Sequence, residues 1–268
     1  MARATLFRKV TFSAGHRYWS ELLTPEENIA QFGQWASRYN HGHNYAVWVG
    51  VSGDVDKSTG MVVNIKDIDA ILQQCVVKRF DQKSLNDEAM VGKVPCLETL
   101  LCEVAGSLTG LPDGVQLESV KIIELPGFYG EWSQGVLTLT RTYEFAAAHR
   151  LASPDLSDEE NFALYGKCTN ANGHGHNYVL EVTVTGDTDP STGFLCDISA
   201  LDQIVEREVV SRYDHKNLDK DVPELQGKTT TSENVAIAIF SLLKDRLPAE
   251  LKRIKLFETA RNAFEVEA

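Results

Sequence analysis

The sequence of this chain repeats itself, with matching segments 133 to 135 residues apart. His16 recurs as His149, and the His-Gly-His that begins at His41 recurs at His174. Because chance does not supply so many matches in one register, we expect two modules of one fold, 1–135 and 136–268. The matched segments are 12–17 with 145–150, 41–45 with 174–178, 58–60 with 191–193, 81–83 with 214–216, Glu98 with Glu233, and Glu124 with Glu258.

Hydrophobic patterning predicts the same order of elements in each half. In the second half Tyr178, Leu180 and Val182 alternate with more polar residues, as in a half-buried strand. A ββααββ order predicts an α+β fold, an antiparallel sheet with helices on one face. A long polar loop is expected after each first strand. The expected strands are 6–12, 119–125, 128–132, 137–145, 253–258 and 263–266, with one more after each His-Gly-His, and the expected helices are 65–80, 97–108, 198–213 and 232–247.

Charge and composition exclude several classes of function. The 268 residues carry a net charge of −12, which argues against a nucleic-acid partner because phosphate binding needs a basic face. An anionic substrate would need a local basic cluster. We expect no membrane partner and a cytoplasmic location, because no apolar run reaches membrane-spanning length and the N-terminus has no signal-peptide core. The five cysteines include no CxxC pair, which is typical of a reduced chain.

Six of the seven histidines fall in the repeated motifs, three per half. Residues i and i+2 of a strand point to one face, so each His-Gly-His can converge on one point. The third histidine ends the preceding strand and joins them if the two strands pair. Three imidazoles without a fourth protein ligand are typical of catalytic zinc with an open position. The alternative is a set of core or turn histidines that recur only through duplication. The candidate metal ligands are His16, His41 and His43, and His149, His174 and His176.

Further candidates for chemistry lie in the second half. Cys168 lies six residues before His174 in an Asn- and Gly-rich loop, where a thiol near a metal is expected to act as a base. Asp214 and His215 form a candidate acid–base pair. Glu258 ends a strand and can hold an amidine-like edge through two hydrogen bonds. The structural alternatives are a small buried thiol, a surface histidine, a turn carboxylate and a solvated strand end.

Several segments of the second half together resemble the 6-pyruvoyltetrahydropterin synthase family over nearly the whole module. The resemblance implies that His149, His174 and His176 bind zinc, that Cys168, Asp214 and His215 are catalytic, and that Glu258 anchors a pterin, with Thr231 and Ser232 lining its pocket. The segments are 145–151 (FAAAHRL), 165–168 (YGKC), 172–178 (NGHGHNY), 214–219 (DHKNLD), 232–234 (SEN) and 257–259 (FET).

The resemblance also implies a fold, a reaction and an assembly. In the tunnelling fold (T-fold), sheets of several modules join into a barrel, and sites form between modules. The implied enzyme is a carbon–oxygen lyase acting on phosphates, in tetrahydrobiopterin biosynthesis. It converts 7,8-dihydroneopterin triphosphate to 6-pyruvoyltetrahydropterin and triphosphate, with Zn²⁺ and with assistance from Mg²⁺. The implied state is a homo-oligomer, a trimer or a multiple of three chains.

The first half resembles the same family but departs from it at the catalytic positions. Its histidine triplet and Glu124 are present, so metal binding and a pterin-anchoring carboxylate are expected there too. Trp35 stands at the position of Cys168, and Gln82 at that of His215. The tripeptide 96–98 (CLE) replaces 231–233 (TSE). We therefore expect a degenerate first module and a catalytic second module.

Two other functions stay open at this point. The first is 6-carboxytetrahydropterin synthase of the deazapurine pathway, which shares fold and metal. The five residues between Cys168 and His174 favour the pyruvoyl enzyme. The second is a non-catalytic pterin-binding role, which suits the first half. One sequence does not identify the residues that bind triphosphate, the oligomer number or the pathway end product.

Overall fold

The computed structural model describes residues 2–268, which form two compact units. Unit 1 holds the chain up to Leu139 together with Gly186–Leu195, and unit 2 holds Thr140–Thr185 and Cys196–Ala268. The units therefore follow the two repeats except in one segment. Gly186–Leu195 belongs to the second repeat by sequence, but it packs in unit 1.

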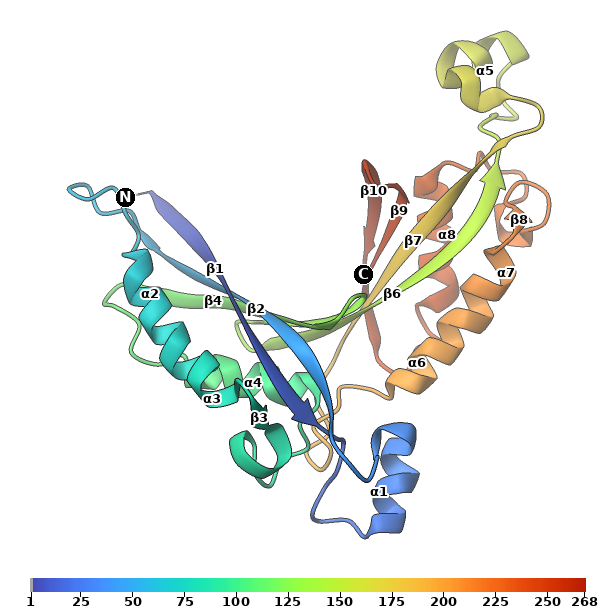
Figure 1. Ribbon diagram of the computed structural model, residues 1–268. Coiled ribbons are helices and arrows are strands. Elements are labelled where there is room, and N and C mark those ends of the chain that lie inside the picture. Colours follow the sequence, from blue (N-terminus) through green and yellow to red (C-terminus); the bar gives the residue numbers. More distant parts are fainter. Residues whose placement is uncertain (1) are drawn as a thin grey trace. The chain divides into compact units, whose positions relative to one another are not determined.

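Unit 1 is an antiparallel sheet with the helices of residues 65–80 and 97–107 against one face (Figure 1). Its strands run in the order β3-β1-β2-β4-β5, and only the short β3 is parallel to its neighbour β1. The elements are β1 (Arg3–His16), α1 (Pro25–Phe32), η1 (Gly33–Trp35), β2 (His41–Asp54), α2 (Ile65–Leu72), the π-helical η2 (Gln73–Val77), α3 (Lys78–Phe80), β3 (Lys83–Ser84), the π-helical η3 (Leu85–Ala89), α4 (Leu97–Ser107), β4 (Gln116–Leu125) and β5 (Phe128–Ser133).

Unit 2 repeats this arrangement. Its strands run in the order β10-β9-β7-β6, and the short β8 lies parallel beside β6. The elements are β6 (Val136–His149), α5 (Asp158–Tyr165), η4 (Gly166–Thr169), β7 (His174–Thr185), α6 (Ile198–Val205), the π-helical η5 (Glu206–Val210), α7 (Ser211–Tyr213), β8 (Lys216–Asn217), η6 (Pro223–Leu225), α8 (Ser232–Leu243), β9 (Glu250–Thr259) and β10 (Asn262–Glu267).

The core of each unit lies between sheet and helices, and aromatic residues close the end that leads to the histidines. In unit 1, Phe12 stacks on Tyr45 and on Phe80, with ring centroids 4.8 and 5.5 Å apart. In unit 2, Phe145 stacks on Tyr178 at 5.1 Å. These rings are buried, so they hold the ends of the paired strands in a fixed place. The histidine motifs follow at these strand ends.

The α+β class and the repeated order of elements agree with the expectation from the sequence, but the polar loops do not. Each contains a helix, α1 or α5, that begins with a capping box. Thr24 and Ser157 accept a hydrogen bond from the backbone of Glu27 and Glu160, whose side chains bond back. This Thr/Ser-x-x-Glu signal was available in the sequence. The last predicted helix also ends earlier, at Leu243.

None of the helices among residues 2–268 is long and apolar enough to cross a membrane.

Candidate metal centres and the surrounding site

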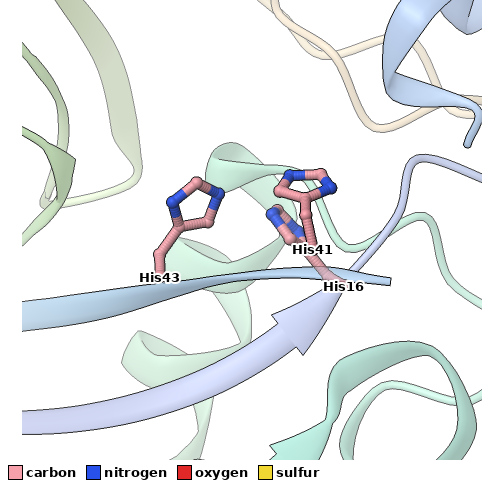
Figure 2. Close-up of side chains that lie close together, drawn as sticks. All are labelled: His16, His41 and His43. Carbon is pink, nitrogen blue, oxygen red and sulfur yellow. The ribbon is translucent and has the colours of Figure 1, made fainter. Parts of the chain in front are cut away.

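Three histidines of unit 1 converge where strand β1 ends and strand β2 begins (Figure 2). The antiparallel register sets His16 opposite His41, and His43 lies two residues further along β2 on the same face. The ring of His16 lies 4.6 Å from that of His41 and 5.1 Å from that of His43 between centroids. One ring nitrogen of each lies within 4.8 Å of the others. This spacing suits one ion held by three imidazoles.

Unit 2 carries the same arrangement on β6 and β7. His149 lies 4.6 Å from His174 and 5.2 Å from His176 between ring centroids. The Nε2 atoms of His149 and His174 are 3.2 Å apart, and the three ligand nitrogens again lie within 4.8 Å. In each repeat, the three predicted histidines thus lie close together in the structure.

Backbone carbonyls orient the first histidine of each triplet. His16 Nδ1 lies 2.7 Å from the carbonyl oxygen of Pro95, and His149 Nδ1 lies 2.7 Å from that of Thr230. Each Nδ1–H donates to its carbonyl, so the Nε2 lone pair faces the cluster, as in protein metal sites. No sequence signal marks these carbonyls, because they depend on how the strand meets the loop before α4 or α8.

The two triplets meet the chemical requirements for a metal ion. Among the described residues, the buried Nε2 atoms of His43 and His176 have no hydrogen-bond partner. Burial lowers the pKa of His16 to about 3 and lowers the pKa of the other five histidines below the ordinary value. All six rings are therefore neutral near pH 7 and can donate a lone pair. Each cluster could hold one metal ion.

A carboxylate stands beside each triplet, but its surroundings differ. Glu258 Oε1 lies 3.6 Å from His149 Nε2 and accepts from Ser232 Oγ at 2.9 Å, while Oε2 accepts from Asn262 Nδ2 at 2.7 Å. Burial alone would raise the pKa of Glu258, but these hydrogen bonds outweigh it and the pKa lies below its ordinary value. Asn262 was missed from the sequence, although it begins β10 only four residues after Glu258.

Glu124 is the first-repeat counterpart, and its Oε1 lies 3.7 Å from His43 Nε2. Leu97 begins α4 where Ser232 begins α8, and Phe128 begins β5 where Asn262 begins β10. Neither Leu97 nor Phe128 carries a side-chain donor. The first repeat therefore cannot orient its carboxylate with the same two bonds.

Cys168 and Trp35 occupy equivalent places. The carbonyl oxygen of Cys168 accepts from Leu151 N at 2.9 Å, and that of Trp35 accepts from Tyr18 N at 3.0 Å. Leu151 and Tyr18 each lie two residues beyond the first histidine of a triplet, so both turns are tied to the strand end. The Cys168 side chain is half-buried and is not part of the ligand cluster among the described residues.

Asp214 and His215 form a hydrogen-bonded pair just before β8. His215 Nδ1 lies 2.7 Å from Asp214 Oδ2, and Asp214 Oδ1 accepts from Ala146 N at 2.7 Å. These two bonds, that from Ala146 first, hold the pKa of Asp214 below its ordinary value. The His215 side chain is 83% exposed, and the backbone of His215 adopts a left-handed φ of 57°, as the backbone of Gln82 does. The shared backbone shows that the two turns match while their chemistry differs.

The Gly186–Leu195 loop packs close to the first triplet, because Phe194 contacts Tyr18, whose ring lies 5.5 Å from that of His16 between centroids. Phe194 packs on Tyr18 and Phe32, with centroids 5.0 and 5.6 Å apart. Leu195 N donates to Glu98 Oε1 at 2.8 Å. Glu98 is only 2% exposed, so the loop buries a carboxylate that it also satisfies. Sequence reasoning did not anticipate this contact, which joins residues far apart in the chain.

The Glu98 carboxyl group should make the stability of unit 1 depend on pH. Burial raises its pKa above the ordinary 4.5 despite the bond from Leu195. Such a group adds stability below its unfolded pKa and loses it as pH rises through the folded value. Glu98→Gln keeps an acceptor for Leu195 but carries no titratable group. As pH rises, we therefore expect the melting temperature of the variant to increase relative to that of wild type by about 2–4 °C, roughly 1 kcal/mol. Glu26→Gln, at an exposed glutamate, is the control, and a gain independent of pH would contradict the argument.

The fold and the two clusters define a duplicated α+β protein with one three-histidine cluster per repeat that could hold a metal ion. The model of the family described as 6-pyruvoyl tetrahydropterin synthase matches residues 5–133 and again residues 138–268. The chain therefore belongs to that family, and the predicted resemblance and the duplicated fold are confirmed.

Individual relatives match about half of the chain. The 6-pyruvoyl tetrahydrobiopterin synthases of Pongo abelii and Homo sapiens are 47% and 46% identical to it over 125 residues, 46% of this chain and 86% of each relative. The solved 6-pyruvoyl tetrahydropterin synthase of Caenorhabditis elegans is 43% identical, with a TM-score of 0.48, over 50% of this chain and 96% of that chain.

Proposed function

We propose that the chain converts 7,8-dihydroneopterin triphosphate to 6-pyruvoyltetrahydropterin with loss of triphosphate, as a zinc-dependent carbon–oxygen lyase. The reaction belongs to the second repeat, and the first repeat is a degenerate module with a metal site. The observation that carries the proposal is the second-repeat cluster. It combines a histidine triplet with a carboxylate held by two donors, beside a thiol-bearing turn.

The residues of the second repeat divide the chemistry as follows. His149, His174 and His176 would hold the zinc ion, which supplies Lewis acidity toward the hydroxyl groups of the substrate side chain. Glu258, with Thr231 and Ser232 beside it, binds the pterin through its amidine-like edge. Cys168 as a thiolate removes a proton from the side chain next to the ring. His215, oriented by Asp214, carries the second proton, and no external redox cofactor is needed. Bound Mg²⁺ would supply positive charge toward the triphosphate.

The function is tested by incubating the zinc-loaded protein with 7,8-dihydroneopterin triphosphate. Intact triphosphate should appear in proportion to the substrate consumed, and a chelator should stop its release. Release of single phosphates, or no release from zinc-replete protein, would overturn the proposal.

Assembly is part of the proposal, because the His215 side chain is 83% exposed and, among the described residues, is not part of the ligand cluster of its own repeat. We infer that the Asp214–His215 pair acts at a site completed when several modules join into a barrel. Three chains, or a multiple of three, supply the modules that the T-fold ring requires. Light scattering at micromolar concentration should give such a mass. A monomer would leave sheet edges unpaired and would contradict this assembly.

Asn262 is expected to act in substrate binding. Asn262→Ala removes one of the two donors that orient Glu258, so the carboxylate loses its fixed direction toward the pterin. A hydrogen bond to a charged group contributes about 1.5–3 kcal/mol, so we expect KM to rise roughly 10- to 100-fold. Arg261→Ala, at the exposed neighbour that precedes Asn262 in the turn between β9 and β10, serves as the control. An unchanged KM for Asn262→Ala would show that Glu258 does not need this support.

A further inference from the structure

The second-repeat loop that packs in unit 1 provides a pattern for contact between copies of this chain. Gly186–Leu195 places Phe194 against Tyr18 and Phe32, and it gives the backbone N–H of Leu195 to the buried Glu98. The interaction therefore needs two parts: a loop with an apolar tip, and a surface with an apolar floor and a glutamate.

The first repeat has the same loop. Residues 56–62 repeat the Asp-x-Ser-Thr-Gly pattern of residues 189–195, with the same internal bonds. Gly60 N donates to the Asp56 carbonyl at 2.8 Å, as Gly193 N does to Asp189 at 2.7 Å. Met61, at the position of Phe194, is 45% exposed. The loop is thus preformed, and its apolar tip is uncovered.

The second repeat has the matching surface. Leu151, Tyr165 and Glu233 stand at the positions of Tyr18, Phe32 and Glu98. Leu151 and Tyr165 are half-buried, and Glu233 is exposed although its counterpart Glu98 is fully covered. A glutamate that accepts a backbone N–H in one repeat is therefore open to solvent in the other.

We propose that loop 56–62 of one chain docks on Leu151, Tyr165 and Glu233 of a second copy. Met61 takes the place of Phe194, and Glu233 accepts the N–H of Val62. Such a contact joins different surfaces of identical chains, so it repeats from chain to chain and closes a ring when the rotation allows.

The docked loop would also line the second-repeat site. Phe194 packs with the cluster that contains Trp35 and Cys96, and the counterparts of these two residues are Cys168 and Thr231. The first repeat, which lacks the thiol and the imidazole, would thus supply a wall of the site in a neighbouring chain. This consequence rests on the proposed function, whereas the docking itself does not.

Photocrosslinking in the full-length protein tests the docking without any turnover. Met61→p-benzoylphenylalanine should give covalent dimers in which position 61 is joined to the 151–165 segment of a second chain. Phe194→p-benzoylphenylalanine is the positive control and should label the segment from Tyr18 to Phe32 within one chain. Val91→p-benzoylphenylalanine, at an apolar residue 63% exposed in the same unit, sets the background.

Two results would overturn the proposal: dimer yield from position 61 no higher than from position 91 while position 194 crosslinks, or crosslinks that join position 61 to other segments. If the variant at position 61 does not fold, Tyr165→p-benzoylphenylalanine provides the reciprocal test, and it must capture residues 56–62 of a second chain. A protein that fails to convert the pterin triphosphate but gives these dimers would refute the proposed function alone.

Discussion

Cys168→Ala is expected to lower the rate of triphosphate release by about 10²–10⁴-fold, the usual cost of losing a general base. Alanine cannot accept a proton, and the turn that carries it is tied to Leu151 by its backbone carbonyl, so the fold should be kept. Metal content and oligomer mass should equal those of wild type. The rate is measured under saturating substrate with the variant fully loaded with zinc.

Trp35→Ala is the matched control, because Trp35 occupies the same turn of the first repeat. It should leave the rate unchanged, since tryptophan accepts no proton. It should lower the melting temperature, because Trp35 packs against the buried cluster of unit 1. An active Cys168→Ala protein would show that the thiol is not the base.

Removing one metal ligand from one repeat at a time should distinguish the roles of the two histidine triplets even more clearly. Wild-type protein should bind two zinc ions per chain, one per triplet, and both His41→Ala and His174→Ala should bind one. His174→Ala should lose nearly all turnover, because the remaining two imidazoles leave the site without its Lewis acid. His41→Ala should keep its turnover. Metal analysis and triphosphate release on the same samples give both readings.

The reverse pattern, an inactive His41→Ala protein at undiminished oligomer mass, would assign the reaction to the first repeat. A wild-type stoichiometry that stays at one under zinc-replete conditions would mean that the first triplet is a relic of the duplication.

The sequence was sufficient for the fold class and the histidine clusters for a physical reason. Because of the duplication, each motif occurs twice in the sequence. Residues two apart on a strand, such as His174 and His176, point to the same face of the sheet. The element order followed from alternation and helical periodicity, which are local properties of the chain. The two capping boxes were equally local, at Thr24 and Ser157, so helices α1 and α5 were also within reach of the sequence.

Contacts between distant segments were not readable in the same way. Asn262 supports Glu258 only because β9 turns back into β10, and Thr230 meets His149 only because a long connection returns to the end of β6. The place of Phe194 on Tyr18 depends on a segment of one repeat packing in the unit of the other. Such partners are set by tertiary packing, which residue spacing does not encode.

The two repeats differ at the side chains proposed for catalysis and agree at the residues that hold the fold. Gln82 and His215 share a left-handed backbone, and Asp81 and Asp214 both accept a strand N–H, from Ser13 and Ala146. The aspartate therefore has a structural role in both repeats. Its catalytic role is proposed only for the second, where an imidazole follows it.

The identity of the pterin product tests the central claim most directly. Zinc-loaded protein is incubated with 7,8-dihydroneopterin triphosphate. The pterin product is then separated under anaerobic conditions and identified by its mass in a mass spectrometer. The account predicts 6-pyruvoyltetrahydropterin, formed with triphosphate by wild type and not by Cys168→Ala. Formation of 6-carboxytetrahydropterin, or of the pyruvoyl product at an equal rate by Cys168→Ala, would contradict it.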